Sequence, residues 1–328
     1  MSYIVIDQGT SSTKAFLFNA KGEILHQKKK KYKLETPKPF HIECDPQIIL
    51  DDIVNLFNAM ASEGNNENIY GVGFAFQRST FLFWEKLTCN PVTPAISWQD
   101  SRATIILDKF KKYEEEIWQI TGAPLSAHFG GPKYCHMVQN NRSLKRKAKG
   151  GEVYFGPLSA FIVHAITGNA AIDESIAGRT LMYNLKKGGW SKFALDLFNV
   201  PVDCLPPIKP VKHEYGNFLD SKIPLLAVIG DQQSALIGQS RLKKFTIGAN
   251  FGTSASIQYN VGSKPVITPG LISSILFSDQ KNKYYILEGT INACNALFHH
   301  LEKVLDIPHK RMLWHIRTKG IITEGIYI

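Results

Sequence analysis

Residues 4–18 read Ile-Val-Ile-Asp-Gln-Gly-Thr-Ser-Ser-Thr-Lys-Ala-Phe-Leu-Phe, and this stretch decides the fold. Two strand-like runs, residues 4–6 and 14–18, flank the polar residues 7–12, a pattern that predicts a β-hairpin. A third strand is expected after the turn Asn-Ala-Lys-Gly at residues 19–22. In the polar segment, glycine lets the backbone approach an anion closely, and successive N–H groups form a nest for phosphate. The opening of the chain therefore predicts a phosphate-binding hairpin.

The rest of the chain alternates strands with helices. Asp45 followed by Pro46 predicts a helix start, with Asp as the N-cap and Pro at the first helical position. Residues 69–76 and 225–229 predict strands, and residues 102–113 predict a helical stretch. Because polar residues follow the strands, we expect an α/β sheet with its site along the carboxyl ends of the strands.

Length and composition indicate a two-domain cytoplasmic protein. The 328 residues contain 44% hydrophobic and 20% charged residues, which is typical of a globular chain. No apolar run reaches the roughly 18 residues of a membrane span, and no secretory signal precedes the first strand, so we expect no membrane partner. Five cysteines without a CxxC pair argue against a disulfide framework and against a zinc knuckle.

The net charge of +10 leaves three ligand classes open: nucleic acid, an anionic membrane surface and an anionic small molecule. We expect the basic run at residues 28–33 to be a lysine-protected edge strand, and residues 145–149 to be a helix end that Gly150 terminates. Neither run is interleaved with aromatic residues, as a stacking platform for nucleic acid would be. Nucleic acid is therefore the weaker alternative.

Residues 245–254 repeat the pattern of residues 4–11: a strand, then Asp or Asn, one residue and Gly-Thr-Ser. The repeat predicts two related half-domains whose turns clasp a polyphosphate, although so short a match also arises by chance. Asp7 ends its strand at a position suited to hold Mg²⁺ through water. The alternative for Asp7 alone is an Asx turn.

A second set of polar residues follows the later strands. Asp231 comes after a strand and Gly230 and precedes a helix, so it is either a helix N-cap or a general base for a hydroxyl. Arg78 and Gln232 suit the hydroxyls of a polyol, and the indole of Trp98 suits its C–H groups, although Trp98 alone is also compatible with the core.

Seven motifs stand in one order along the chain: Asp7-Gln8-Gly9-Thr10-Ser11-Ser12-Thr13-Lys14, Phe76-Gln77-Arg78, Trp98-Gln99-Asp100-Ser101-Arg102, Gly178-Arg179-Thr180, Gly230-Asp231-Gln232-Gln233-Ser234-Ala235-Leu236, Phe251-Gly252-Thr253 and Leu287-Glu288-Gly289. With them the chain resembles the FGGY carbohydrate kinases, most closely the glycerol-kinase branch. The resemblance implies an actin-like (ribonuclease-H-like) ATPase fold. Residues 1–238 would form the complete sugar-side domain, and residues 239–328 the start of a nucleotide-side domain that is truncated at its C-terminus.

The resemblance also implies site residues and co-substrates, with ATP and Mg²⁺ bound beside a small sugar or polyol. It makes Asp231 the catalytic base and, with Asp7, a metal-organising carboxylate. The implied phosphate-binding residues are Gly9, Thr10, Ser11, Lys14, Gly252 and Thr253. The implied substrate-binding residues are Arg78, Ser79, Trp98, His128, Gln232 and Ser256.

Four departures from glycerol kinases concern these positions. Glycerol kinases carry Glu, Tyr and Phe where this chain has Ser79, His128 and Ser256, and Arg where it has Lys14. Loss of a carboxylate and of two aromatic walls predicts a roomier pocket, so we expect an acceptor larger than glycerol. Lys133 matches another family signature, in which His136 replaces tryptophan.

Three functions remain in competition at this point. The first is an ATP-dependent carbohydrate or polyol kinase. The second is a truncated, catalytically impaired kinase remnant that serves as a sugar-binding or structural module. The third is an actin-like assembly protein, which has no need of Arg78, Trp98 and Gln232 in a polyol site. A homodimer is a further alternative that the residues leave open.

Overall fold

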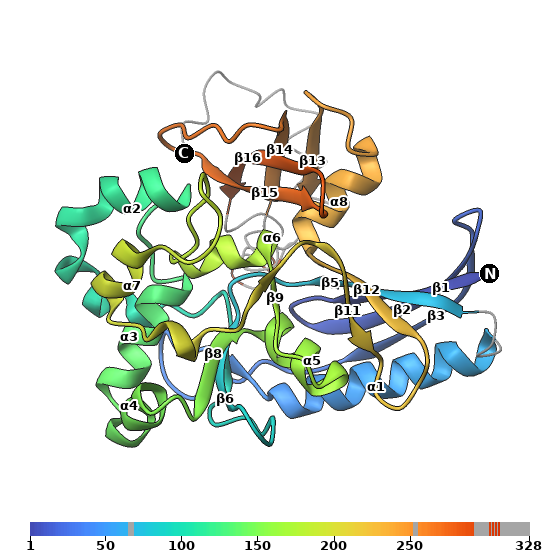
Figure 1. Cartoon of the computed structure of the whole chain (residues 1–328), viewed down its shortest axis with the longest axis horizontal. Coiled ribbons are helices and arrows are strands. Elements are labelled where there is room, and N and C mark those ends of the chain that lie inside the picture. Colours follow the sequence, from blue (N-terminus) through green and yellow to red (C-terminus); the bar gives the residue numbers. More distant parts are fainter. Residues whose placement is uncertain are drawn as a thin grey trace.

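The computed structural model describes residues 1–64, 69–251 and 255–291, with single positions 302, 304, 306 and 308. Within these residues, a mixed sheet of six strands forms the centre of the larger part of the molecule (Figure 1). Strands β1, β5 and β12 run parallel, and β2, β3 and β11 are antiparallel to their neighbours. The order across the sheet is β11 (Lys212–Asn217), β12 (Pro224–Gly230), β5 (Ile69–Phe76), β1 (Ser2–Gln8), β2 (Ser12–Asn19) and β3 (Ile24–Lys31).

The opening hairpin is confirmed. Strands β1 and β2 pair antiparallel, with Asp7 opposite Lys14 at the end that carries the polar turn. Alternate residues of β1 point to opposite faces, so Ile4 and Ile6 are fully buried while Asp7 is not. The hairpin therefore fixes which face of the sheet receives the Asp7 carboxylate.

Helix α1 (Pro46–Glu63) begins as expected, because the Asp45 carboxylate accepts the N–H of Gln47. Its apolar residues pack beneath the central sheet with those of α5 (Leu158–Thr167). The rings of Phe57 and Phe218 stack there with centroids 3.6 Å apart. Burial of one face of the sheet by α1 and α5 leaves the strand ends and the opposite face to form the site (Figure 1).

A second core lies beside a smaller sheet of four strands in the order β4 (Glu43–Cys44), β7 (Ala95–Ile96), β6 (Phe81–Glu85) and β8 (Val153–Pro157). The helices around it are α2 (Glu114–Thr121), α3 (Gly130–Gln139), α4 (Arg142–Lys149) and α7 (Lys192–Phe198). Short elements complete this region: β9 (Ile172–Asp173), α6 (Glu174–Ala177), η4 (Gly178–Thr180), η5 (Val202–Cys204) and β10 (Ile208–Lys209).

The helical stretch expected at residues 102–113 is helical but not α-helical. It forms two 3₁₀-helices, η2 (Arg102–Lys109) and η3 (Lys111–Tyr113). The backbone N–H of Thr104 donates to the carbonyl of Ser101, and that of Tyr113 to the carbonyl of Phe110. These three-residue spacings are the tighter pattern of a 3₁₀-helix.

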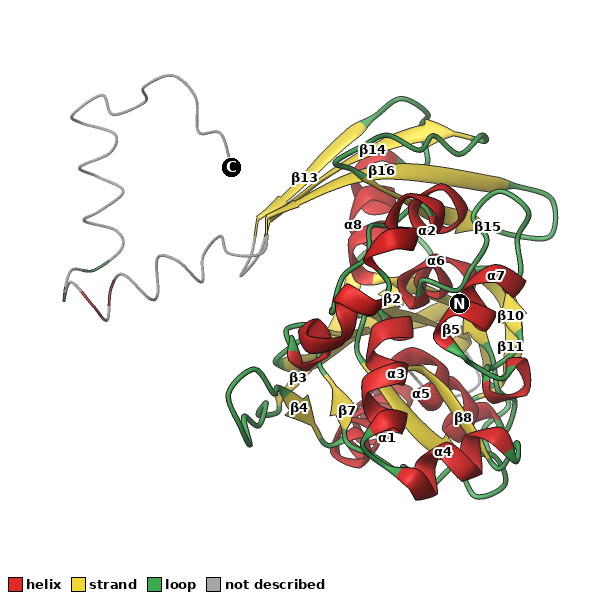
Figure 2. Ribbon diagram, turned by 90° about the vertical axis from the view of Figure 1, so that its left-hand side faces the viewer, coloured by secondary structure: helices red, strands yellow, loops and turns green. Residues whose placement is uncertain are grey.

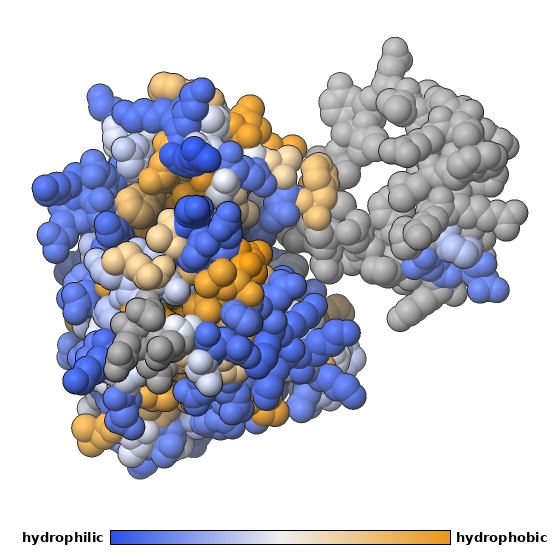
Figure 3. Space-filling view, turned by 90° about the vertical axis from the view of Figure 1, so that its right-hand side faces the viewer, coloured by the Kyte–Doolittle hydropathy of each residue, from blue (hydrophilic) through white to orange (hydrophobic). Residues whose placement is uncertain are grey.

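The chain enters a third sheet through α8 (Asp231–Ser240), as Figure 2 shows. This sheet has the order β13 (Ile247–Phe251), β14 (Ala255–Gly262), β16 (Lys283–Ile291) and β15 (Ile272–Ser278). Leu276 and Ile286 pack on Leu236 of α8 and are buried, whereas Ile247 and Ile257 are exposed. Figure 3 shows apolar side chains gathered at the middle and top of one face of the molecule, among hydrophilic neighbours. The second hairpin expected near residues 245–254 is confirmed by β13 and β14, but its turn at 252–254 lies outside the described residues.

The two basic runs also lie as expected. Strand β3 is an edge of the central sheet, and its Lys28 and Lys30 pair with Glu63 and Asp52 of α1. Helix α4 ends at Lys149, before the cap residue Gly150. In the described part of the chain, no helix combines the length and apolar character needed to cross a bilayer.

Candidate active site

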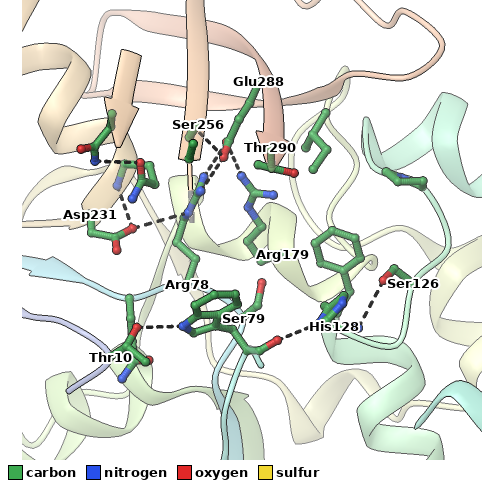
Figure 4. Close-up of a pocket in the computed structure, with 18 residues that line it drawn as sticks. Thr10, Arg78, Ser79, Ser126, His128, Arg179, Asp231, Ser256, Glu288 and Thr290 are labelled. Atoms are coloured by element: carbon green, nitrogen blue, oxygen red, sulfur yellow. Dashed lines mark hydrogen bonds and ion pairs between the residues drawn. The ribbon is translucent and has the colours of Figure 1, made fainter. Parts of the chain in front are cut away.

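A cleft of about 400 Å³ opens between the central sheet and the third sheet (Figure 4). That volume is within the range of small-molecule sites. The cleft brings together eight residues proposed from the sequence: Thr10, Arg78, Ser79, Trp98, His128, Asp231, Gln232 and Ser256. Ten further residues complete its walls: Gln77, Pro124, Ser126, Phe129, Arg179, Asn250, Ala255, Ile272, Glu288 and Thr290. Segments far apart in the chain therefore converge on one small-molecule cavity.

Asp231 is the first residue of α8 and follows β12 directly. The N-cap position belongs to Gly230, and the Asp231 carboxylate accepts the N–H of Gln232, so the alternative of Asp231 as an N-cap is wrong. Its side chain remains 30% exposed toward the cleft. Burial raises the pKa of Asp231 above its ordinary value, Arg78 opposes this increase, and the nearby Asp7 adds to it. The carboxylate is thus more basic than a free aspartate and accessible to a ligand.

Arg78 follows β5 and forms an ion pair with Glu288 of β16 through two parallel hydrogen bonds of 2.6 Å. Arg179 of η4 donates to the same carboxylate, also at 2.6 Å (Figure 4). Although burial alone raises the pKa of Glu288, the two guanidinium groups hold it well below its usual range. Burial and the neighbouring Arg78 lower the pKa of Arg179 to about 10. The two arginines and Glu288 form a buried charged cluster that joins the third sheet to the rest of the cleft.

Trp98 links the turn of the β1–β2 hairpin to the opposite wall of the cleft. Its indole Nε1 donates to the hydroxyl of Thr10 at 2.8 Å, and its carbonyl lies 2.7 Å from Nδ1 of His128. A carbonyl only accepts, so Nδ1 of His128 carries the proton, and the other ring nitrogen, Nε2, is left for a ligand. In the neutral ring that nitrogen is an acceptor for a hydroxyl group.

The turn after β1 is held by a side-chain network. The carbonyl of Gly9 accepts the hydroxyl of Tyr32 at 2.5 Å and the amide of Gln8 at 2.8 Å. Burial raises the pKa of Tyr32, so its hydroxyl remains a donor at neutral pH. The N–H of Gly9 itself donates to the carbonyl of Ser12. Gly9 therefore shapes the turn, and its own amide is occupied within the turn.

Asp7 and Asp231 both line a second cavity, of about 530 Å³, on the sheet side of the cleft. Asp7 also pairs with Lys14, whose Nζ lies 3.1 Å from the carboxylate. Among the described residues no group of three or more His, Cys, Asp or Glu could cage a metal ion. Two carboxylates on one cavity nevertheless suit Mg²⁺, which keeps several waters and takes its other ligands from phosphates.

Ser79 has a left-handed backbone, with φ at +62°, and a buried side chain. The fully buried Lys133 of α3 donates to the carbonyl of Ser79 at 2.8 Å and to that of Ser97 at 2.6 Å. Burial lowers the pKa of Lys133 to about 7. Lys133 thus ties together two of the segments that carry cleft residues.

The remaining residues proposed from the sequence do not line the cleft or lie outside the described residues. Ser11 is exposed at the turn, and Lys14 contacts Asp7 without lining the cleft. Gly252 and Thr253 lie outside the described residues. Sequence reasoning gave no role to Arg179 or Glu288, although both stand in motifs that carry the resemblance to carbohydrate kinases. Their motifs were the signal that could have identified them.

Comparison with solved structures places this architecture among the sugar kinases, which have the actin-like ATPase fold. Glycerol kinase of Plasmodium falciparum, solved with ADP, superposes with a TM-score of 0.87 at 27% sequence identity, over 94% of this chain and 65% of that one. Xylulose kinase of Lactobacillus acidophilus gives a TM-score of 0.84 at 21% identity, over 97% of this chain and 66% of that one. Gluconate kinase of Lactobacillus acidophilus gives 0.83 at 21% identity, with the same shares. The chain thus spans about two thirds of the length of each.

The sequence comparison agrees with the fold. Glycerol kinase of Bacillus cereus is 34% identical over 338 aligned positions, which cover 98% of this chain and 68% of that protein. Glycerol kinase of Bacillus anthracis matches with the same identity and coverage. Residues 2–238 match the model of the N-terminal domain of the FGGY family of carbohydrate kinases. The chain belongs to the FGGY family of carbohydrate kinases.

Proposed function

We propose that the protein is an ATP-dependent carbohydrate or polyol kinase that transfers the γ-phosphoryl group of ATP to a hydroxyl of its acceptor. The observation that carries the proposal is the position of Asp231, whose partly exposed carboxylate opens both to the cleft and to the cavity that Asp7 lines. A base at this junction can reach an acceptor hydroxyl on one side while a phosphoryl group arrives from the other.

In this proposal the acceptor lies in the cleft beside Arg78, His128 and Gln232. Arg78 donates to its oxygens, while Nε2 of His128 is left to hydrogen-bond with a hydroxyl. Asp231 takes the proton of the reacting hydroxyl as that oxygen attacks the γ-phosphorus in line with the leaving ADP oxygen. The raised pKa of Asp231 increases its affinity for the proton that it removes.

The phosphates of ATP would meet the turn at Gly9, Thr10 and Ser11, where Gly9 would allow close approach of the backbone although its own N–H is occupied, with Lys14 nearby as a point charge. Asp7 and Asp231 would hold Mg²⁺ through its waters. When bound, the ion offsets charge on the β- and γ-phosphate oxygens. Gly252 and Thr253 are proposed for the second phosphate turn on the strength of the sequence alone.

We further propose that the acceptor is larger than glycerol. Ser79, His128 and Ser256 all line the cleft at the positions where glycerol kinases carry Glu, Tyr and Phe. Ser256 is smaller than the phenylalanine of glycerol kinases and leaves space in the cleft. Its hydroxyl also makes a polar contact, because it lies 3.4 Å from the Glu288 carboxylate. The named relatives include glycerol, xylulose and gluconate kinases, so acceptors of three to six carbons form the natural test set.

Coupled ADP release tests both parts of the proposal. Glycerol, xylitol, D-xylulose and D-gluconate are each assayed with ATP and Mg²⁺, and ADP release without acceptor is subtracted. Acceptor-dependent ADP release with a five- or six-carbon compound as the best acceptor is expected. Glycerol as the clear best acceptor contradicts the size argument. Binding of an acceptor without any ADP release favours a sugar-binding module over a kinase.

A further inference from the structure

The charged cluster formed by Arg78, Arg179 and Glu288 joins two sides of the cleft. Glu288 comes from β16 of the third sheet, whereas Arg78 and Arg179 follow β5 and α6 on the other side of the cleft. The Glu288 side chain has no exposed area, and those of Arg78 and Arg179 are 11% and 5% exposed. The Glu288 carboxylate therefore reaches from the third sheet to the other side of the cleft, where it binds both guanidinium groups away from bulk water.

The hydrogen bonds determine how the Arg78 guanidinium is oriented. Its Nη1 donates to Glu288 and, at 3.3 Å, to Gln233, and its Nη2 donates to the other oxygen of Glu288. A guanidinium has five N–H donors. One N–H of Nη2 is thus left without an acceptor within the described residues, while Nε faces Asp231 in an ion pair of 3.6 Å and makes no hydrogen bond. This N–H of Nη2 is the donor available to an acceptor molecule in the cleft.

The same anchoring keeps the ion pair between Arg78 and Asp231 from shortening to a hydrogen bond. Nε of Arg78 stops 3.6 Å from Oδ1 of Asp231, beyond hydrogen-bond distance. If Glu288 lost its charge, Asp231 would be the remaining carboxylate within reach of Arg78. A direct hydrogen bond between them would occupy the oxygen that must receive the proton of the acceptor.

We propose that Glu288 is a positioning residue that reaches across the cleft to hold Arg78 toward the acceptor and to keep it from hydrogen-bonding to the Asp231 carboxylate. This inference rests on the proposed kinase function. Arg179 contributes by sharing Oε2 of Glu288 with Arg78, which fixes the carboxylate between two cations. Loss of the Glu288 charge should therefore affect both the acceptor KM and kcat, because a misplaced Arg78 weakens acceptor binding and also blocks the base.

A second ion pair on the same strand provides a matched control. Lys283 of β16 pairs with Glu174 of α6 at 2.6 Å, and this contact also joins the third sheet to the rest of the molecule. Lys283 and Glu174 do not line the cleft. Lys283→Met therefore removes a contact of the same kind without touching the proposed acceptor site.

The test compares wild type, Glu288→Gln, Arg179→Lys and Lys283→Met in steady-state kinetics with each of glycerol, xylitol, D-xylulose and D-gluconate. For Glu288→Gln we expect the acceptor KM to rise about tenfold and kcat to fall about 100-fold, as expected when a base is blocked. The KM for ATP should change less than twofold. Lys283→Met should keep all three constants. Arg179→Lys, which keeps the cation but not the planar fork, should give an intermediate loss and remains informative if Glu288→Gln does not fold.

Several results would overturn the inference. The first is that Glu288→Gln has the same kinetic constants as Lys283→Met. The second applies if Glu288→Gln does not fold, and it is that Arg179→Lys has wild-type kinetic constants. A third is equal loss of acceptor and ATP affinity, which indicates general disorder. Acceptor binding without ATP, measured by calorimetry, separates this inference from the proposed function. If wild type binds an acceptor but transfers no phosphate, the kinase proposal fails, and a tenfold weaker Kd in Glu288→Gln still supports the positioning role. Wild type that binds none of the four compounds overturns both.

Discussion

Nε of Arg78 lies 3.6 Å from Oδ1 of Asp231, although the two groups are oppositely charged and line the same cleft. A direct N–H···O hydrogen bond would need about 2.7–3.2 Å. The separation persists because both terminal nitrogens of Arg78 are bound to Glu288. Asp231 thereby keeps an accessible oxygen beside a cation that stabilises it without occupying it.

Acceptor choice should respond to the residues at positions 79 and 128. In the double variant Ser79→Glu with His128→Tyr, the cleft loses space and regains the carboxylate that glycerol kinases carry. We expect the ratio of kcat/KM for glycerol to that for the best larger acceptor to rise about tenfold, the scale of discrimination for small changes in a pocket. The ratio is measured by coupled ADP release.

Ser62→Glu is the matched control. Ser62 is exposed on α1, so this substitution adds the same charge away from the cleft. The control should leave the ratio unchanged. An unchanged ratio in the double variant, with a Tm close to that of wild type, would show that these positions do not set acceptor size.

The β1–β2 turn, which we propose to bind the phosphates of ATP, should depend on the indole N–H of Trp98. Trp98→Phe keeps an aromatic face but loses the 2.8 Å hydrogen bond to Thr10. A hydrogen bond of this type contributes about 1 kcal/mol, so we expect the KM for ATP to rise about fivefold. Trp118→Phe is the control, because the indole N–H of Trp118 has no hydrogen-bond partner among the described residues. Equal effects of the two substitutions on the KM for ATP would contradict the role of the Trp98 bond.

Lys133 should make stability depend on pH. Its pKa in the folded protein is about 7, below the ordinary 10.5, because of burial. Between these values the unfolded chain binds a proton that the folded protein does not, so the free energy of unfolding rises with pH. Relative to Lys133→Met, wild type should gain about 2 kcal/mol between about pH 7 and about pH 9.

Urea denaturation of both proteins at the two pH values measures this difference. Taking the difference between the proteins removes the titration of buried thiols that do not interact with Lys133, such as Cys204, which acts on both alike. A parallel pH dependence in wild type and Lys133→Met would mean that Lys133 is charged in the folded state.

The sequence was sufficient for the parts of the fold that local chemistry determines. The hairpin β1–β2 follows from alternating burial, and the start of α1 follows from the Asp45 cap and Pro46. The 3₁₀ geometry of η2 and η3 was not predictable from the same pattern, because apolar spacing does not distinguish hydrogen bonds to the third residue from those to the fourth.

Only part of the candidate site could be predicted from the sequence. Residues at strand ends, such as Arg78 and Asp231, were found because their position along the chain predicts a common edge. Glu288 was not, because it lies within a strand, where alternation gives a face of the sheet but not its partner across the cleft. Its ion pair spans 210 positions of sequence, and no local pattern encodes such a contact.

In the proposed reaction Asp231 acts as the general base while the γ-phosphoryl group of ATP passes directly to the acceptor. The most direct measurement follows the γ-phosphoryl group of labelled ATP into product in wild type and in Asp231→Asn, with Asp196→Asn as control. Asp196 is an exposed carboxylate of α7 that pairs with Lys192. We expect phosphorylated acceptor from wild type and from Asp196→Asn. Asp231→Asn should bind the acceptor as tightly but form product at least about 100-fold more slowly. Product formation by Asp231→Asn at the wild-type rate would contradict the account.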